Sequence, residues 1–232
     1  MPGNIIGKSI LAHITTPYYA DYHVHDNAVA TVINTVDIPH LIQGLFSVES
    51  IKGFTFYAGS TGSITNTADN GSGLLRCTTA APHGLSTADV LNTSGLTTAA
   101  QNKITRVTVV DASNFDCDDI PFLTGAETGE FYEGDKLVCN SGASGIYKAE
   151  MHMFGKSSVA NKIFEFELYK NVTPQDNVEA KNRFSTNTTE TMGGGGIITL
   201  AEGDVITVGV INNTDTTNFT IEHLNVVLHN IE

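Results

Sequence analysis

The sequence predicts an all-β protein, an antiparallel sandwich or jelly roll that carries a small inserted β domain. From Asn140 to Ile231, apolar and polar residues alternate with a period of two, which is typical of sheets with one face on a core and one in water. Gly, Asn and Asp separate these segments, and no segment has the period of a helix. Only 16% of the 232 residues are charged and 22 are glycine, a composition that favours strands and turns.

The strands of the second half are the most regular. In Gly145–Phe154, the polar residues Lys148, Glu150 and His152 face one side and apolar residues face the other. Ile163–Tyr169 alternates apolar side chains with glutamates in the same way. Further strands are expected at Asp21–Asp26, Ala28–Ile33, Ile42–Val48, Phe54–Tyr57, Asp204–Ile211 and Phe219–His229.

The composition changes along the chain and predicts three parts. Residues 1–20 form an N-terminal arm that is too short to be a domain, and its apolar side chains are expected to dock on its own domain or on a neighbour. Residues 21–66 and 137–232 form the sandwich. Residues 67–136 form a small β module inserted between them, with the Gly-rich segment Thr67–Gly73 as the linker at its entry.

Charge and targeting signals narrow the function classes. The net charge of −13 argues against non-specific nucleic-acid binding, which needs lysine and arginine to replace phosphate counterions. The first residues lack the apolar region of a signal peptide, and no apolar stretch has the length of a membrane span. The cysteines (Cys77, Cys117, Cys139) have no metal-binding spacing and suit a reducing cytoplasm. We therefore expect a soluble product that binds neither nucleic acid nor membrane.

The inserted stretch carries a recognisable pattern. Thr78–Leu85, with its Pro-His-Gly-Leu sequence, is followed by Asp89–Val90 and by Val107–Phe115. This pattern resembles a small β module that recurs in bacteriophage virion proteins. In that family a glycine precedes the aspartate at a hairpin turn, whereas Ala88 stands there in this chain, and Asn114 replaces a threonine before the phenylalanine.

The flanking residues carry a second resemblance, of pattern only. Gly145–Tyr147 leads into a long strand, Glu165–Asn171 alternates, and Leu200–Val208 is a turn followed by a strand. Residues 28–57 and 137–231 thereby look like the TNF-like jelly roll of phage fibre and head-decoration proteins. The two resemblances imply a virion protein that assembles as a homotrimer.

His23 and His25 are the candidate metal ligands. Alternate strand residues share a face, so three copies around an axis would offer six imidazole nitrogens for an octahedral ion. The alternative is a polar strand face near an interface. No other cofactor is expected.

Other motifs favour structural readings. Asp111, Asp116, Asp118 and Asp119 lack the spacing of a calcium loop and read as a solvated acidic loop. Gly193–Gly196 lacks the Lys-Ser/Thr of a phosphate-binding loop and reads as a flexible or closely approached hairpin connection.

The search for catalytic groups gives no constellation. His83 is expected to cap backbone groups in its turn. Glu165 and Glu167 share a strand face, as in a glycosidase pair, but nothing predicts a raised pKa for either. We therefore do not expect an enzyme.

The leading hypothesis is a capsid-decoration (cement) protein on the outer shell of a phage, made in the host cytoplasm. Apolar residues of the arm, Ile5, Ile6, Ile10, Leu11 and Ile14, would contact the major capsid protein or other virion proteins. The alternative is a tail-fibre or spike protein that binds a host surface receptor, although the shaft repeats of a fibre are missing. A polysaccharide depolymerase is the third hypothesis.

Overall fold

The computed structural model describes residues 17–24, 30–31, 33, 36–42, 46–123 and 125–231. Strands dominate these residues, and the helical element described among them is the short 3-10 helix η1, Ala99–Gln101. No helix in this part of the chain has the length and apolar character that crossing a membrane requires. The fold is all-β and antiparallel, as predicted from the alternating pattern.

One six-stranded sheet, sheet I, has the order β16-β13-β18-β1-β4, with β2 paired to β18. All its pairs are antiparallel, and β13 and β18 form its long central ladder. The strands are β1 Tyr19–Val24, β2 Ala30–Thr31, β4 Ser47–Lys52, β13 Gly145–Ser157, β16 Glu190–Leu200 and β18 Phe219–Asn230.

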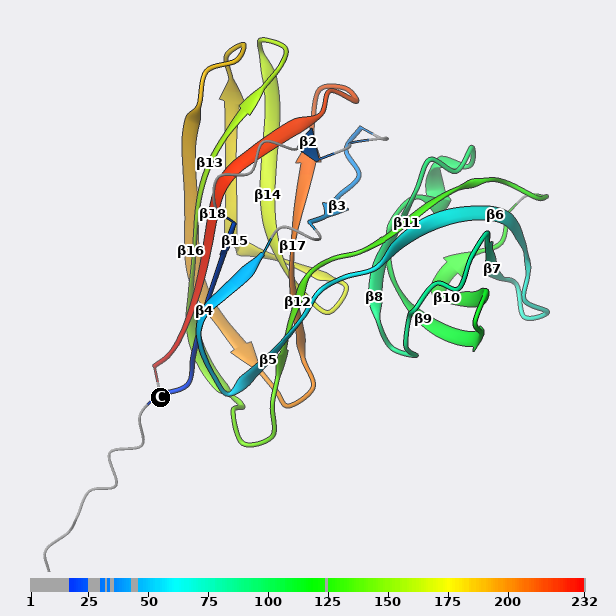
Figure 1. Ribbon diagram of the computed structural model, residues 1–232, viewed down its shortest axis with the longest axis horizontal. Coiled ribbons are helices and arrows are strands. Elements are labelled where there is room, and N and C mark those ends of the chain that lie inside the picture. Colours follow the sequence, from blue (N-terminus) through cyan, green and yellow to red (C-terminus); the bar gives the residue numbers. More distant parts are fainter. Residues whose placement is uncertain are drawn as a thin grey trace, which may run out of the picture.

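A second six-stranded sheet, sheet II, has the order β15-β14-β17-β12-β5, with β3 paired to β17. Its strands are β3 His40–Leu41, β5 Phe54–Tyr57, β12 Lys136–Cys139, β14 Lys162–Lys170, β15 Thr173–Phe184 and β17 Val205–Asn212. Successive strands of the chain alternate between the two sheets or turn at their edges, which is the connectivity of a jelly roll (Figure 1).

The two sheets bury one shared core. Phe164, Phe184 and Phe219 pack against one another in this core, with ring centroids 4.5 to 5.8 Å apart. Tyr22 of β1 packs on Phe46 with centroids 4.6 Å apart. Full burial of one such side chain stabilises the folded state by roughly 1.5–3 kcal/mol. The apolar positions of the alternating pattern are therefore what hold the sheets face to face.

A closed barrel lies between β5 and β12 in the chain, with the strand order β10-β7-β6-β11-β8-β9. Its core is separate from that of the sandwich and includes Phe115 and Phe131, whose ring centroids lie 5.5 Å apart. Closure leaves no free sheet edge. The strands are β6 Thr61–Asp69, β7 Leu74–Thr79, β8 Val90–Ser94, β9 Ile104–Asp111, β10 Asn114–Pro121 and β11 Gly129–Glu133.

The predicted linker at residues 67–73 is wrong. Thr67 to Asp69 complete strand β6, and the glycines that follow form a tight turn to β7. Asp69 Oδ1 accepts the backbone N–H groups of Gly71 (2.7 Å) and Gly73 (2.9 Å), while Asn70 Oδ1 accepts that of Ser72 (2.8 Å). The glycines therefore serve a hydrogen-bonded hairpin inside the barrel. The barrel strands run from Thr61 to Glu133, against predicted module limits of 67 and 136.

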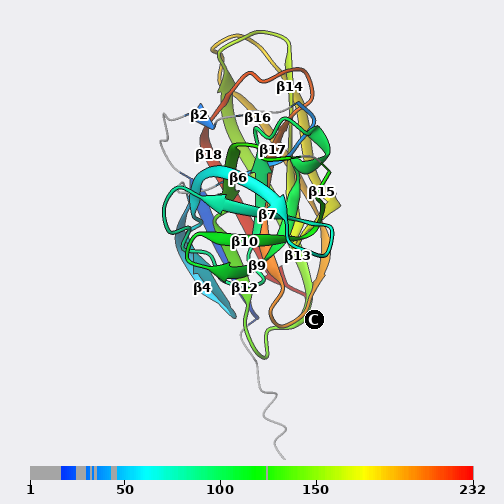
Figure 2. The same ribbon diagram turned by 90° about the vertical axis from the view of Figure 1, so that its right-hand side faces the viewer.

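The barrel docks beside sheet II, away from sheet I (Figures 1 and 2). A small apolar cluster joins the two parts: Leu41 of β3 and Tyr169 of β14 pack with Val90 and Ile104 of the barrel. The backbone N–H of Leu41 also donates to Oδ1 of the buried Asn92, at 3.0 Å. The sandwich thus has one sheet covered by the barrel and one that faces away from it.

Candidate functional site

The outer face of sheet I lies on the side of the sandwich away from the barrel (Figure 1). Alternation places its outward side chains at every second position of β13, β16, β18 and β1. They include histidines on three strands and two exposed apolar residues: His23, His152, His223, His229, Phe154 and Ile197. Lys148 and Glu150 pair with each other at 2.8 Å, so part of the charge on this face is neutralised.

Strand register sets these residues in rows across the sheet. In one row, His152 of β13 lies beside Asn225 of β18, which lies beside His23 of β1. In the next row, Val227 of β18 lies between Glu150 and Asp21. Because β18 is the middle strand of the path, Val227 stands near the centre of the face.

Glycines flatten the side of this face at β16. Gly193 and Gly195 occupy outward positions opposite His152 and Glu150. A Cβ added at Gly193 would stand 3.0 Å from Nδ1 of His152, so the imidazole lies over the glycine backbone. The face therefore combines a flat flank with half-buried side chains at its centre.

Two polar atoms of the centre are unsatisfied. Oδ1 of Asp21 and Oδ1 of Asn225 are buried and have no hydrogen-bond partner among the described residues. Buried polar atoms without a partner are rare in folded proteins, because each loses its bonds to water without replacement. Both oxygens belong to outward residues of sheet I, on the neighbouring strands β1 and β18.

The outer face of sheet II differs from it. Every residue of β17 is buried, and Gly209 lies under the ring of Tyr169 and beside Pro39. Further along this sheet, carboxylates of Glu165, Glu167 and Glu179 gather within 4.8 Å of one another.

The glutamate cluster of sheet II is bonded within the protein. Lys181 Nζ contacts Glu165 at 2.5 Å, and the Tyr169 hydroxyl donates to Glu167. Burial raises the pKa of Glu167, against the lowering effect of that hydroxyl. The sequence predicted no raised pKa for Glu165 or Glu167. This is wrong for Glu167, because its carboxyl group is partly buried in the fold. The cluster is acidic surface with local partners.

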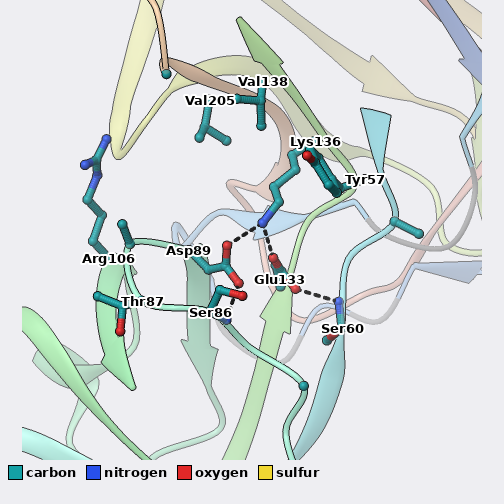
Figure 3. A pocket seen from close by; sticks show the side chains of 14 residues that line it. Tyr57, Ser60, Ser86, Thr87, Asp89, Arg106, Glu133, Lys136, Val138 and Val205 are labelled. Carbon is teal, nitrogen blue, oxygen red and sulfur yellow. Dashed lines mark hydrogen bonds and ion pairs between the residues drawn. The ribbon is translucent and has the colours of Figure 1, made fainter. Parts of the chain in front are cut away.

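A buried ion-pair network joins the barrel to the sandwich (Figure 3). Lys136 Nζ of β12 lies 2.5 Å from Oδ1 of Asp89 and 2.5 Å from Oε1 of Glu133. Burial opposes the charge of Lys136, but its hydrogen bonds to the two carboxylates outweigh burial and raise its pKa. Burial also raises the pKa of Glu133, while Lys136 lowers it.

Asp135 adds backbone contacts to the same junction. Its carboxylate accepts the N–H groups of Phe46 (3.0 Å) and Gly59 (2.9 Å). The other oxygen of Glu133, Oε2, accepts the N–H of Ser60 at 3.0 Å. Side chains of Glu133, at the end of β11, and of Asp135, between β11 and β12, thereby bond the segment that leaves the barrel to the segment that enters it.

Sequence reasoning missed this network. Asp89 is separated from Glu133 and Lys136 by most of the barrel, so their meeting depends on barrel closure. One sequence signal lay at this network: Asp89 belongs to the pattern that resembles the small β module of phage virion proteins.

The predicted metal ligands are placed in part. His23 lies on the outer face of sheet I, while His25 lies outside the described residues, as do Ile5, Ile6, Ile10, Leu11 and Ile14 of the arm. The metal pair and the arm contacts therefore stay predictions.

The prediction for His83 is confirmed. Its Nδ1 accepts the N–H of Leu85 at 3.0 Å and its Nε2 lies 2.8 Å from the carbonyl oxygen of Asp111, so the imidazole bridges two backbone segments. The ring also packs edge-on against Phe115, with centroids 5.6 Å apart.

The predicted acidic loop is wrong in its secondary structure, because Asp116, Asp118 and Asp119 lie on strand β10. Each carboxylate has its own partner. Asp116 pairs with Arg76 at 2.6 Å and Asp119 with Lys103 at 3.0 Å. Asp111, at the end of β9, accepts the N–H of Ser113 at 2.8 Å.

Comparisons with known proteins give no family. No protein-family model matches the chain, and no curated protein matches it in sequence. Among solved structures, Eiger TNF from S. frugiperda is 10% identical over 93% of this chain and 94% of its own, with a TM-score of 0.41.

Two further structures are less similar. One of infectious bursal disease virus Gx strain is 12% identical over 91% of this chain and 70% of its own, with a TM-score of 0.29. The insecticidal delta-endotoxin Cry8Ea1 from Bacillus thuringiensis is 9% identical over 93% of this chain and 53% of its own, with a TM-score of 0.26. These TM-scores are all below 0.5, and we base no functional conclusion on them.

Proposed function

We propose that the protein is a structural subunit of a phage virion that assembles as a homotrimer through the outer face of sheet I and decorates the outer shell of the capsid. The observation that carries the proposal is the contrast between the sheets. The barrel packs on sheet II through Leu41 and Tyr169, whereas the outer face of sheet I faces away from the barrel and has half-buried side chains at its centre. Two buried oxygens of that face, Oδ1 of Asp21 and of Asn225, have no hydrogen-bond partner among the described residues, and Oγ1 of Thr207 on sheet II has none either.

The chemistry of the face supports an interface between copies. Charged residues are depleted at the cores of protein interfaces, and the middle strand β18 presents the uncharged Val227 and Asn225 here, with Asp21 and Glu150 beside Val227. Phe154 and Ile197 add exposed apolar surface, at 44% and 50% exposure. A second copy would bury these groups and offer partners to the unsatisfied oxygens.

Attachment to the shell is assigned to residues 1–16, which lie outside the described part. Their apolar residues, Ile5, Ile6, Ile10, Leu11 and Ile14, are the proposed contacts with the major capsid protein. In a trimer, three weak contacts act together, because the first one raises the effective concentration of the others. Avidity is thus the proposed mechanism of binding.

The proposed role is not enzymatic. At the junction the buried Lys136 is bonded to the buried Glu133 and to the half-buried Asp89, which supports a structural role for these groups. Release of reducing sugar from a polysaccharide by the purified protein would contradict this part of the proposal.

A receptor-binding spike or fibre tip is the second candidate. One observation favours it: the barrel stands out from the sandwich and a cleft opens at the junction, between Tyr57 and Arg106 (Figure 3). Such a protein would bind host cells in the absence of capsids.

Co-sedimentation with purified capsids tests the proposal. The full chain is expected to pellet with capsids of its phage and to raise their melting temperature. A variant without residues 1–16 is expected to stay in the supernatant while it keeps its own melting temperature.

Two outcomes would overturn the decoration role. One is wild-type protein that does not pellet with capsids, and the other is equal pelleting of the shortened variant. Binding to host cells alone, with none to capsids, would establish the spike candidate in its place.

A further inference from the structure

A cleft of about 440 Å³ opens between the barrel and the sandwich (Figure 3). This volume lies within the range of small-molecule sites, roughly 300–1,000 Å³, which occur preferentially where two domains meet. The barrel contributes the turn before β8 and residue Arg106 of β9, and the sandwich contributes Tyr57, Val138 and Val205. The two walls therefore belong to different parts of the fold.

The ion-pair network fixes the distance between these walls. Lys136 of the sandwich bonds to Asp89 of the barrel at 2.5 Å, and Oδ2 of the same aspartate accepts the N–H of Ser86 at 2.7 Å. Both oxygens of Asp89 are thus occupied within the protein. Because the walls of the cleft are already fixed, less conformational entropy of the protein is lost when a ligand binds.

Arg106 is a cation at the cleft that has no ion pair with any described residue, whereas Lys136 is shared by two carboxylates. It stands on the opposite side of the cleft from Lys136 and Tyr57 (Figure 3). A guanidinium presents parallel N–H donors that match a carboxylate in bidentate geometry.

Tyr57 offers an aromatic surface on the other side. Its side chain is 49% exposed, and Lys136 Nζ lies 5.8 Å from the ring centroid. The hydroxyl of Thr87 lines the cleft and accepts the N–H of Val109 at 3.0 Å, which leaves its proton to donate. Ser60 and Ser86 also line the cleft, and Val138 and Val205 form its apolar side.

We propose that this cleft binds an acidic sugar, a pyranose unit that carries a carboxylate. The carboxylate pairs with Arg106, the C–H face of the ring packs on Tyr57, and the sugar hydroxyls bond to Ser86 and Thr87. A guanidinium, an aromatic face and hydroxyl groups together can bind the carboxylate, the C–H face and the hydroxyls of such a sugar. This proposal does not depend on whether the protein is part of a capsid or of a tail.

The charge of the protein separates this proposal from simple anion binding. The net charge of −13 repels anions, so a single guanidinium at a cleft does not hold a free anion well. Ring packing and hydroxyl bonds must supply the remaining affinity. Inorganic phosphate alone is therefore expected to bind more weakly than the sugar.

Saturation-transfer NMR on the full chain tests the proposal, with methyl β-D-glucuronide as the probe. Methyl β-D-glucoside serves as the neutral arm and inorganic phosphate as the anion arm. Saturation is expected to reach the ring protons of the glucuronide, with at least tenfold weaker transfer to the glucoside. Arg106→Gln and Tyr57→Ala are each expected to reduce glucuronide affinity at least tenfold, while Tyr57→Phe keeps it.

Arg183→Gln is the matched control, because this arginine lies on β15 and does not line the cleft. Its binding is expected to equal that of the wild type, and far-UV circular dichroism checks that every variant is folded. The proposal is overturned by absent transfer to the wild type, by unchanged binding in Arg106→Gln, or by equal transfer to the glucoside. Phosphate that competes as strongly as the glucuronide would also overturn it, since the site would then be one for anions.

Discussion

Ala88 shows what a single residue contributes at the barrel turn. Its φ is +77°, a left-handed conformation that costs an L-residue roughly 1–2 kcal/mol. The turn that requires this conformation is closed by a hydrogen bond from Asp89 N–H to Ser86 O at 3.1 Å. The resemblance to the phage module had pointed to a glycine position here, and the backbone explains the preference in physical terms.

Ala88→Gly is expected to stabilise the protein. Glycine removes the strain, but the greater freedom of its unfolded chain costs roughly 0.5–1 kcal/mol, so the net gain in stability is up to about 1.5 kcal/mol. Ala81→Gly, in the same loop but without a positive φ, is the control and is expected to destabilise. Urea denaturation measures both, and a lower midpoint for Ala88→Gly than for the wild type would contradict this account.

Asp116 makes the barrel sensitive to acid. The hydrogen bond from Arg76 and a second one from Asn70 lower the pKa of Asp116 from its ordinary value of 3.8. Folding therefore favours the ionised form. This stabilisation is fully present above about pH 4 and is lost as the pH falls through the folded pKa.

Asp116→Asn is expected to lower stability at neutral pH and to flatten its decline below about pH 4. Urea midpoints measured between pH 7 and about pH 3 give the two curves. Asp176→Asn, which removes an exposed carboxylate on β15, is the control and should keep the wild-type decline. Parallel curves for Asp116→Asn and the wild type would argue against the role of Asp116.

Residue chemistry was predictable where it is local. His83 accepts the N–H of Leu85 two residues away, so its capping role could be inferred from the Pro-His-Gly-Leu turn, whereas its contact with Asp111 at the end of β9 could not. The Lys136 network was not predictable, because Asp89 reaches Lys136 through closure of the barrel and docking of two separate cores.

At the scale of elements, β16 explains the glycine run. Gly193–Gly196 lie inside this strand, so the predicted hairpin connection is wrong. The expected close approach is present: a Cβ at Gly194 or Gly196 would overlap the carbonyl oxygen of Glu179 or Asn177 on β15. The glycines allow the edges of the two sheets to meet.

Gly194→Ala is expected to destabilise the sandwich by roughly 1–3 kcal/mol or more, because the new methyl group forces β15 and β16 apart. Gly195→Ala is the control, since its Cβ would face outward with its nearest neighbour, Ala149 O, at 3.1 Å. Thermal denaturation compares them. Equal melting temperatures for the two variants would contradict the proposed contact.

Strands with a clear alternation were predicted well, and others were missed for a physical reason. The predicted segment Gly145–Phe154 lies within β13, and Ile163–Tyr169 lies within β14. β15 was missed because most of its side chains are exposed and it contains Pro174. β1 was placed two residues late, at Asp21, because its start carries tyrosines and no alternation of charge.

At the scale of the whole molecule, the jelly roll was predictable and the docking of its parts was not. Alternating apolar and polar residues indicate that one face of a strand is buried. They do not indicate whether another part of the molecule covers the opposite face of that strand. The barrel covers sheet II through Tyr169 and Leu41, residues that read as ordinary strand positions in the sequence. Because the barrel docks on sheet II, the outer face of sheet I stays free of it. The assembly proposal depends on this face.

Sedimentation equilibrium of the full chain tests the assembly most directly. A protein concentration of about 10 µM is chosen because weak, non-specific association needs millimolar concentrations. At this concentration the wild type is expected to sediment with three times the chain mass of 24.7 kDa. Val227→Arg places a long cation at the centre of sheet I, where Glu150 and Asp21 can pair with it in one chain, and is expected to sediment as a folded monomer. Val110→Arg, at a 45% exposed position on the barrel, should remain trimeric. A wild type at the mass of one chain, or a Val227→Arg variant that assembles like the wild type, would contradict the account.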